Sequence, residues 1–169
     1  VLYFAGHSLG LMPKNAQEYI NEECHAWAKY GVEGHFKSSH PWLSYHELLT
    51  ESMANLVGGK TSEVVVMNTL TVNLHLMMVS FYRPTKARYK ILIEPNTFPS
   101  DQYAVDSQAK FHGFDPKEAV VELVPRDGEE TLRSQDILDK IDELGDELAL
   151  VMLGNVNYLT GQCFDFKSI

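Results

Sequence analysis

The stretch Glu63–Phe81 constrains the fold most, because its apolar pattern changes period half way along. Val64–Met67 is a short β-branched run typical of a buried strand, whereas Val72–Tyr82 is apolar over a length that favours a helix. The junction, Asn68–Thr71, offers threonines that can cap this helix. Free N–H groups and the positive end of the helix dipole suit a phosphate there. A capped core helix that binds nothing is the commoner outcome of such a pattern, so phosphate binding needs support from other residues.

From Glu63 onward, strand-like and helical stretches alternate, which predicts crossover units and an α/β fold with a mainly parallel sheet. The expected strands are 64–67, 89–94, 120–124 and 148–153, and the expected helices are 72–82, 100–111 and one from 134 to 144. Because such crossovers are right-handed, we expect Asn68–Thr71 and Thr97–Asp101 on one rim of the sheet. Ligands of open α/β sheets bind at that rim.

Two helices are expected before the first strand. Asn15 with Glu18, and Ser44 with Glu47, are capping-box patterns followed by apolar residues at helical spacing. The segment between these helices, residues 31–41, has no periodicity and is expected to be a loop. We therefore predict an N-terminal segment with helices over residues 1–60 and an incomplete cofactor-binding α/β domain over residues 61–169.

Charge and composition exclude several classes of function. The formal net charge is −9 and Lys and Arg form no cluster, which argues against a nucleic-acid partner and against an anionic membrane surface. Cys24 and Cys163 are far apart, which indicates neither a disulfide framework nor a metal site and favours the cytoplasm. No segment has the pattern of a signal peptide or a membrane span. Because the chain starts at Val1 and ends at Ile169 after an expected loop, we expect it to be part of a longer protein.

The segment Phe98–Asp101 follows an expected strand and opens an expected helix. Phe98 can present its ring face to a flat ligand, although core packing would also explain it. Ser100 can cap the helix, and Asp101 is favourable in its first turn. Together with a phosphate at Asn68–Thr71 on the same rim, these residues favour a flat aromatic ligand with a phosphate tail, such as pyridoxal 5′-phosphate.

Several sequence blocks resemble the N-terminal part of the kynureninase family, in the family's order and along essentially the whole chain. These blocks are Tyr3–Leu11, Pro41–Trp42, Val66–His75, Ser80–Thr85, Phe98–Asp101, Pro125–Arg126 with Glu129–Arg133, and Thr160–Gln162. Several such blocks together are far more specific than any single motif.

The resemblance implies a fold-type I pyridoxal-phosphate enzyme that is a homodimer. It implies hydrolysis of L-kynurenine or 3-hydroxykynurenine to anthranilate or 3-hydroxyanthranilate and L-alanine, in tryptophan catabolism and NAD biosynthesis. In the family, the Schiff-base lysine and the aspartate that pairs with the pyridine nitrogen come later than Ile169, so this chain alone is expected to be inactive. The alternatives are a related fold-type I enzyme, such as a cysteine desulfurase or an aminotransferase, and a non-catalytic α/β module that binds a phosphorylated ligand.

The resemblance also implies roles for individual residues. Leu70 and Thr71 match residues that hold the cofactor phosphate, and Phe98 matches the residue that stacks on the pyridine ring. The rest of its segment, Pro99, Ser100 and Asp101, matches the cofactor site, and Ser8 and His35 match residues near the substrate. The family often has a small hydroxyl residue near Gly154 that can touch the phosphate, and a glycine offers only its backbone for that contact.

Overall fold

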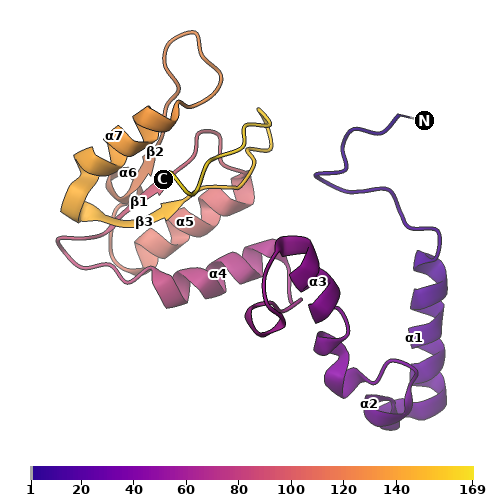
Figure 1. Cartoon of the computed structure of the whole chain (residues 1–169). Coiled ribbons are helices and arrows are strands. Elements are labelled where there is room, and N and C mark those ends of the chain that lie inside the picture. The colour runs from indigo at the N-terminus through magenta and orange to yellow at the C-terminus, as the bar shows by residue number, and fades with distance from the viewer. Residues whose placement is uncertain (1) are drawn as a thin grey trace. The chain divides into compact units, whose positions relative to one another are not determined.

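The computed structural model describes residues 2–169 (Figure 1). The chain divides into two compact units, of which the first extends to Met67 and the second is Asn68–Ile169. The regular secondary structure of the first unit is helical, and the second unit contains the sheet. The finer division into an N-terminal segment over residues 1–60 and a cofactor-binding domain over residues 61–169 stays a prediction.

The first unit contains one longer helix, α1, and several short helical segments. In chain order these are α1 (Ala16–Tyr30), the 3-10 helix η1 (Gly31–Glu33), α2 (Gly34–Lys37), η2 (Trp42–Glu47), α3 (Thr50–Val57) and η3 (Thr61–Glu63). Helix α3 ends at Gly58, whose φ of 71° lies in the left-handed region that favours glycine.

Four expectations for this unit are wrong in detail. Residues 31–41, expected to be a loop, contain the helical turns η1 and α2. The expected helix after Ser44 begins only at Thr50, because Ser44 has non-helical dihedral angles. Neither expected capping box forms, since Asn15 makes no side-chain cap bond and Ser44 lies inside η2 instead of at the start of a helix. Val64–Met67 forms no strand, because no strand among residues 2–169 lies beside it to share hydrogen bonds.

The second unit is an α/β structure with a three-stranded parallel sheet, as the alternating pattern predicts. Its elements are α4 (Leu70–Phe81), β1 (Lys90–Ile93), α5 (Pro99–Phe111), α6 (Pro116–Ala119), β2 (Val120–Glu122), α7 (Ser134–Leu144), η4 (Gly145–Glu147) and β3 (Leu148–Met152). The strand order is β2-β1-β3, so β1 is central. The sequence pattern missed the short helix α6, which Asp115 caps by accepting a bond from the Lys117 N–H at 3.0 Å.

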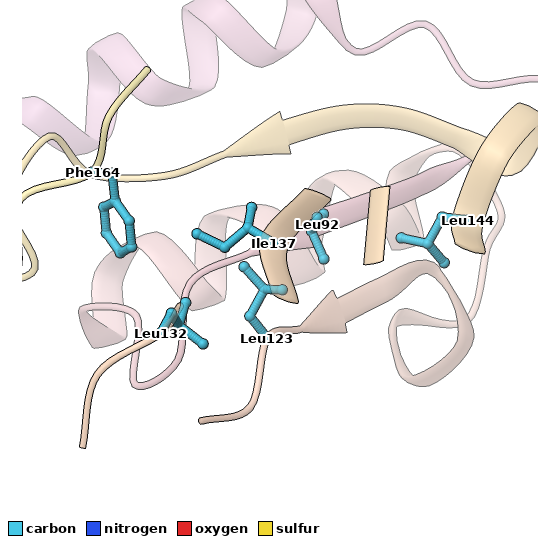
Figure 2. Packing of buried hydrophobic residues seen from close by; sticks show 6 residues of the cluster. All are labelled: Leu92, Leu123, Leu132, Ile137, Leu144 and Phe164. Carbon is cyan, nitrogen blue, oxygen red and sulfur yellow. The ribbon is translucent and has the colours of Figure 1, made fainter. Parts of the chain in front are cut away.

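Helices cover both faces of the sheet, and successive side chains of β1 point to these opposite faces. Leu92 packs against α7 in a cluster of six buried residues, shown in Figure 2: Leu92, Leu123, Leu132, Ile137, Leu144 and Phe164. Its neighbours Ile91 and Ile93 pack on the opposite face, against Met78 of α4, Tyr82 directly after α4 and Val105 of α5. Ile91, Leu92 and Ile93 of β1 are fully buried, and burial of each side chain contributes about 1.5–3 kcal/mol.

Aromatic residues hold the end of the sheet where β1 begins. The Tyr82 hydroxyl, on a side chain that is 1% exposed, donates to the Tyr89 carbonyl at 2.7 Å. The Tyr82 ring meets the His112 ring nearly at a right angle, with centroids 5.4 Å apart, and Tyr89 stacks on Phe114 with centroids 4.6 Å apart. Burial raises the pKa of the Tyr82 hydroxyl. These contacts join α4, β1 and α5 at this end of the unit.

Candidate functional site

Helices α4 and α5 lie side by side and run in the same direction. Near the middle of α4, His75 Nδ1 is 3.0 Å from Gln108 Nε2 of α5. At the C-terminal ends, the Tyr82 and His112 rings are in contact. The N-terminus of α4, with Leu70 and Thr71, is therefore at the same end of this helix pair as the N-terminus of α5, with Phe98. His75 is half-buried, and Gln108 is its hydrogen-bond partner.

The N-terminus of α4 presents backbone donors. Thr69 occupies the N-cap position, but its hydroxyl makes no cap bond, so the predicted capping by threonine does not occur. The first N–H groups of a helix have no partner within the helix, and here the Thr69 side chain does not cap them. Leu70 is exposed and Thr71 is half-buried. Backbone N–H groups, the Thr71 side chain in the first turn and the helix dipole form a set that suits an anion.

The segment Phe98–Asp101 lies where β1 leads into α5, as predicted. Phe98 itself is at the N-cap position, and its carbonyl accepts the N–H of Asp101 at 2.9 Å. Pro99 is the first residue of the helix, a position where proline loses no hydrogen bond. Ser100 therefore lies inside the helix and does not cap it, and its hydroxyl bonds to the Asp101 carboxylate at 3.3 Å. The Phe98 side chain is 50% exposed, which leaves its ring accessible to a ligand.

A second aromatic residue, which the sequence pattern did not reveal, lies at this place. The ring of Tyr158, from the loop after β3, meets the Phe98 ring at 75° with centroids 5.3 Å apart. The loop is fixed by Asn157, which is 3% exposed and donates to Glu94 Oε2 at 3.1 Å. Glu94 is itself buried and also accepts the Gly154 N–H at 3.3 Å. The only signal in the sequence was a turn-rich segment after an expected strand, which does not identify contacts to Phe98.

Ser8 and His35, predicted to lie near the substrate, are both in the first unit. Ser8 is exposed, and its N–H closes a turn onto the Ala5 carbonyl at 3.1 Å. His35 lies in α2 and packs edge-on against Trp42, with ring centroids 5.5 Å apart. The Trp42 Nε1–H donates to Glu23 Oε2 of α1 at 2.8 Å, so this indole connects His35 to α1. Their roles near a substrate stay predictions.

A groove of about 620 Å³ lies in the first unit beside α1. Its lining is mostly apolar and comes from Tyr19, Ile20, Glu22, Glu23, Cys24, His40, Tyr45, Leu48 and Leu49. None of the predicted site residues lines it, and the chemistry proposed below does not use it. Within residues 2–169, no cluster of His, Cys, Asp or Glu could hold a metal ion, and no helix is long and apolar enough to cross a membrane.

Charge pairs shape the connection that precedes α7. The Arg126 guanidinium donates two hydrogen bonds to the Asp136 carboxylate, at 2.9 and 2.6 Å, and thereby lowers the pKa of that carboxyl. Arg133 likewise pairs with Glu129 and lowers the pKa of the Glu129 carboxyl. The connection is joined to the loop that carries Tyr158 through Gln162, whose side-chain amide bonds the backbone N–H and carbonyl of Leu132 at 2.9 and 2.6 Å.

Comparison with known proteins finds curated relatives along the whole chain. No family model matches the chain. The kynureninase of Myxococcus xanthus (strain DK1622) is 68% identical over 169 residues, which are 100% of this chain and 40% of that protein. The kynureninases of Koribacter versatilis (strain Ellin345) and Nematostella vectensis are 60% and 52% identical, each over 99% of this chain and over 40% and 36% of their own lengths.

The chain thus spans about two fifths of the length of the curated relatives that it matches. These relatives are consistently named kynureninase, which does not favour a cysteine desulfurase, an aminotransferase or a non-catalytic module. The resemblance to kynureninase that the sequence blocks indicated is confirmed over the whole chain.

Proposed function

We propose that the full-length protein is a kynureninase, which uses pyridoxal 5′-phosphate to hydrolyse a carbon–carbon bond in the side chain of L-kynurenine or 3-hydroxykynurenine. The products would be anthranilate or 3-hydroxyanthranilate and L-alanine. One observation carries the proposal: curated kynureninases match this chain from end to end at 51–68% identity. Tryptophan catabolism, NAD biosynthesis and a cytoplasmic location are part of the same proposal.

The residues at the N-termini of α4 and α5 fit the cofactor. The uncapped N–H groups of α4 suit its phosphate, with the Leu70 and Thr71 backbone and the Thr71 hydroxyl as donors. The half-exposed Phe98 ring suits its flat pyridine ring. Pro99, Ser100 and Asp101 would complete this side of the site. The phosphate and the pyridine ring of the cofactor would thus each meet a suitable group, the N–H groups of α4 and the Phe98 ring. Both groups lie at the same end of the pair of helices α4 and α5.

When bound, pyridoxal phosphate supplies an electron sink for negative charge that develops on the substrate carbon. The residues of this chain would bind and orient the cofactor, and Phe98 would exclude water from one face of its ring. Ser8 and His35 would contact the substrate. A fold-type I architecture, a homodimer and a Schiff-base lysine outside this chain complete the proposal, and the 169-residue chain by itself is expected to be inactive.

The test is to incubate the purified full-length protein and pyridoxal phosphate separately with L-kynurenine and with L-cysteine. We expect anthranilate, followed by its fluorescence, and alanine, followed by amino-acid analysis, to form in equal amounts from kynurenine. Alanine formed from cysteine alone would instead identify a desulfurase, and the proposal would fail. Release of neither product, in a preparation whose visible absorbance shows bound cofactor, would also contradict it.

A further inference from the structure

The turn between β1 and α5, which carries Phe98, is held from both neighbouring strands. On one side, the Asn96 N–H donates to Glu122 Oε1, at the end of β2, at 2.8 Å. Asn96 adopts a φ of 52°, in the left-handed region that asparagine enters more readily than most residues other than glycine. Within the turn, the Thr97 hydroxyl donates to the Glu94 carbonyl at 2.8 Å. These two hydrogen bonds therefore hold the backbone that leads to Phe98, independently of any contact of the Phe98 side chain.

On the other side, the loop after β3 is held by Asn157. Its side-chain amide donates to Glu94 Oε2 at 3.1 Å and to the Pro95 carbonyl at 3.3 Å. Its side-chain oxygen accepts the N–H groups of Leu159 and Thr160, both at 3.0 Å. The buried Asn157 side chain thus connects its own loop to the β1–α5 turn. These bonds determine the position of the adjacent residue Tyr158.

Tyr158 uses that position to contact Phe98. Its ring meets the Phe98 ring at 75° with centroids 5.3 Å apart, a geometry in which one ring fixes the plane of the other. The contact leaves the Phe98 side chain 50% exposed. We propose that Tyr158 is a positioning residue of the cofactor site, which holds the Phe98 ring in the plane on which the pyridine ring stacks. This inference rests on the function proposed above.

The experiment uses the apo form of the full-length protein, titrated with pyridoxal 5′-phosphate. For Tyr158→Ala we expect an affinity loss of about two- to tenfold, the range that loss of one aromatic pair gives. We also expect a smaller visible circular dichroism signal of the bound cofactor, because that signal depends on how firmly the ring is oriented. Tyr158→Phe keeps the ring and should leave both quantities unchanged.

Tyr89→Ala is the matched control, because it removes a member of another aromatic pair, stacked on Phe114 at the opposite end of β1. It should lower thermal stability without changing cofactor affinity. A double-mutant cycle then asks whether Tyr158 acts through Phe98. In the Phe98→Ala background, Tyr158→Ala should have no further effect on affinity or on the circular dichroism signal.

Three results separate the inference from the function on which it rests. A wild-type protein that does not bind pyridoxal phosphate contradicts the proposed function. Binding that Phe98→Ala weakens and Tyr158→Ala leaves unchanged overturns the inference alone. An equal effect of Tyr158→Ala with and without Phe98 also overturns it, because Tyr158 would then act by another route.

Discussion

Replacing Asn157 by alanine should release the loop after β3 from the end of β1. Asn157 is 3% exposed, and its side chain makes two donor bonds to the Glu94–Pro95 turn and accepts three bonds from its own loop. The substitution leaves the Glu94 carboxylate, which is 8% exposed, with the Gly154 N–H at 3.3 Å as its remaining partner in this cluster. A lost bond to a charged group costs about 1.5–3 kcal/mol, and each neutral bond about 1 kcal/mol.

We therefore expect the opening free energy of this loop to fall by about 3 kcal/mol, which corresponds to a roughly 100-fold decrease in amide protection. Hydrogen exchange of the full-length protein measures this at the Leu159 and Thr160 amides, whose N–H groups donate to Asn157. Asn155→Ala is the control, because Asn155 is an exposed residue of the same loop. Unchanged protection of Leu159 and Thr160 in Asn157→Ala would refute the reasoning.

Thr71→Ala should weaken pyridoxal phosphate binding to the full-length apo-protein about ten- to hundredfold on titration, since a lost hydrogen bond to a charged group costs about 1.5–3 kcal/mol. Gly34→Ala should destabilise the protein by about 1–3 kcal/mol in a denaturant titration, because the added Cβ would lie 2.5 Å from a Trp42 ring carbon. The Asp136 carboxyl should titrate, by NMR, below the usual range of aspartates, because Arg126 lowers its pKa. The ion pair of Asp136 with Arg126 should therefore stabilise the fold at pH values above the pKa that this carboxyl has in the unfolded protein. The stabilisation should be lost as the pH falls through the lower pKa of the carboxyl in the folded protein.

Each of these expectations has its own control. Thr71→Ser keeps the hydroxyl and should retain most of the affinity, so an equal loss in both variants would point to packing rather than to a hydrogen bond. Gly10→Ala meets no atom within 4 Å and should leave stability unchanged. Arg126→Gln should raise the pKa of the Asp136 carboxyl towards the usual aspartate range. An unchanged pKa would contradict Arg126 as the cause of the lowered value.

The sequence was a good guide to the second unit because its elements are local and strongly patterned. The strand at 89–94 and the helices at 100–111 and 134–144 agree with β1, α5 and α7 to within one residue at each end. Apolar runs bounded by Pro and Gly define such elements by themselves. The Val64–Met67 prediction failed because a strand is defined by its hydrogen-bonded neighbour, which the apolar pattern of one segment does not reveal.

The helix starts that carry the proposed site were predicted for the same physical reason. Phe98 and Thr71 stand at helix starts, where the switch of periodicity is visible in the sequence. Tyr158 and Asn157 act through contacts to residues about 60 positions earlier, as in the bond from Asn157 to Glu94. No local pattern encodes such a contact. The failed cap at Asn15 has a related cause, because its ψ of 3° departs from the extended backbone that an N-cap residue usually has.

The aromatic contacts at the start of β1 have a consequence for laboratory evolution of this protein. Tyr82, Tyr89 and Phe114 join three elements at the end of the sheet opposite to Phe98. Libraries that diversify this aromatic end should mostly yield variants that differ in abundance and heat tolerance. Libraries around Phe98 and Tyr158 should yield variants that differ in reactivity at similar abundance. A search for altered specificity can therefore begin with substitutions near Phe98, at one end of β1. Substitutions near Tyr89, at the other end of β1, can then restore stability that the first set has lost.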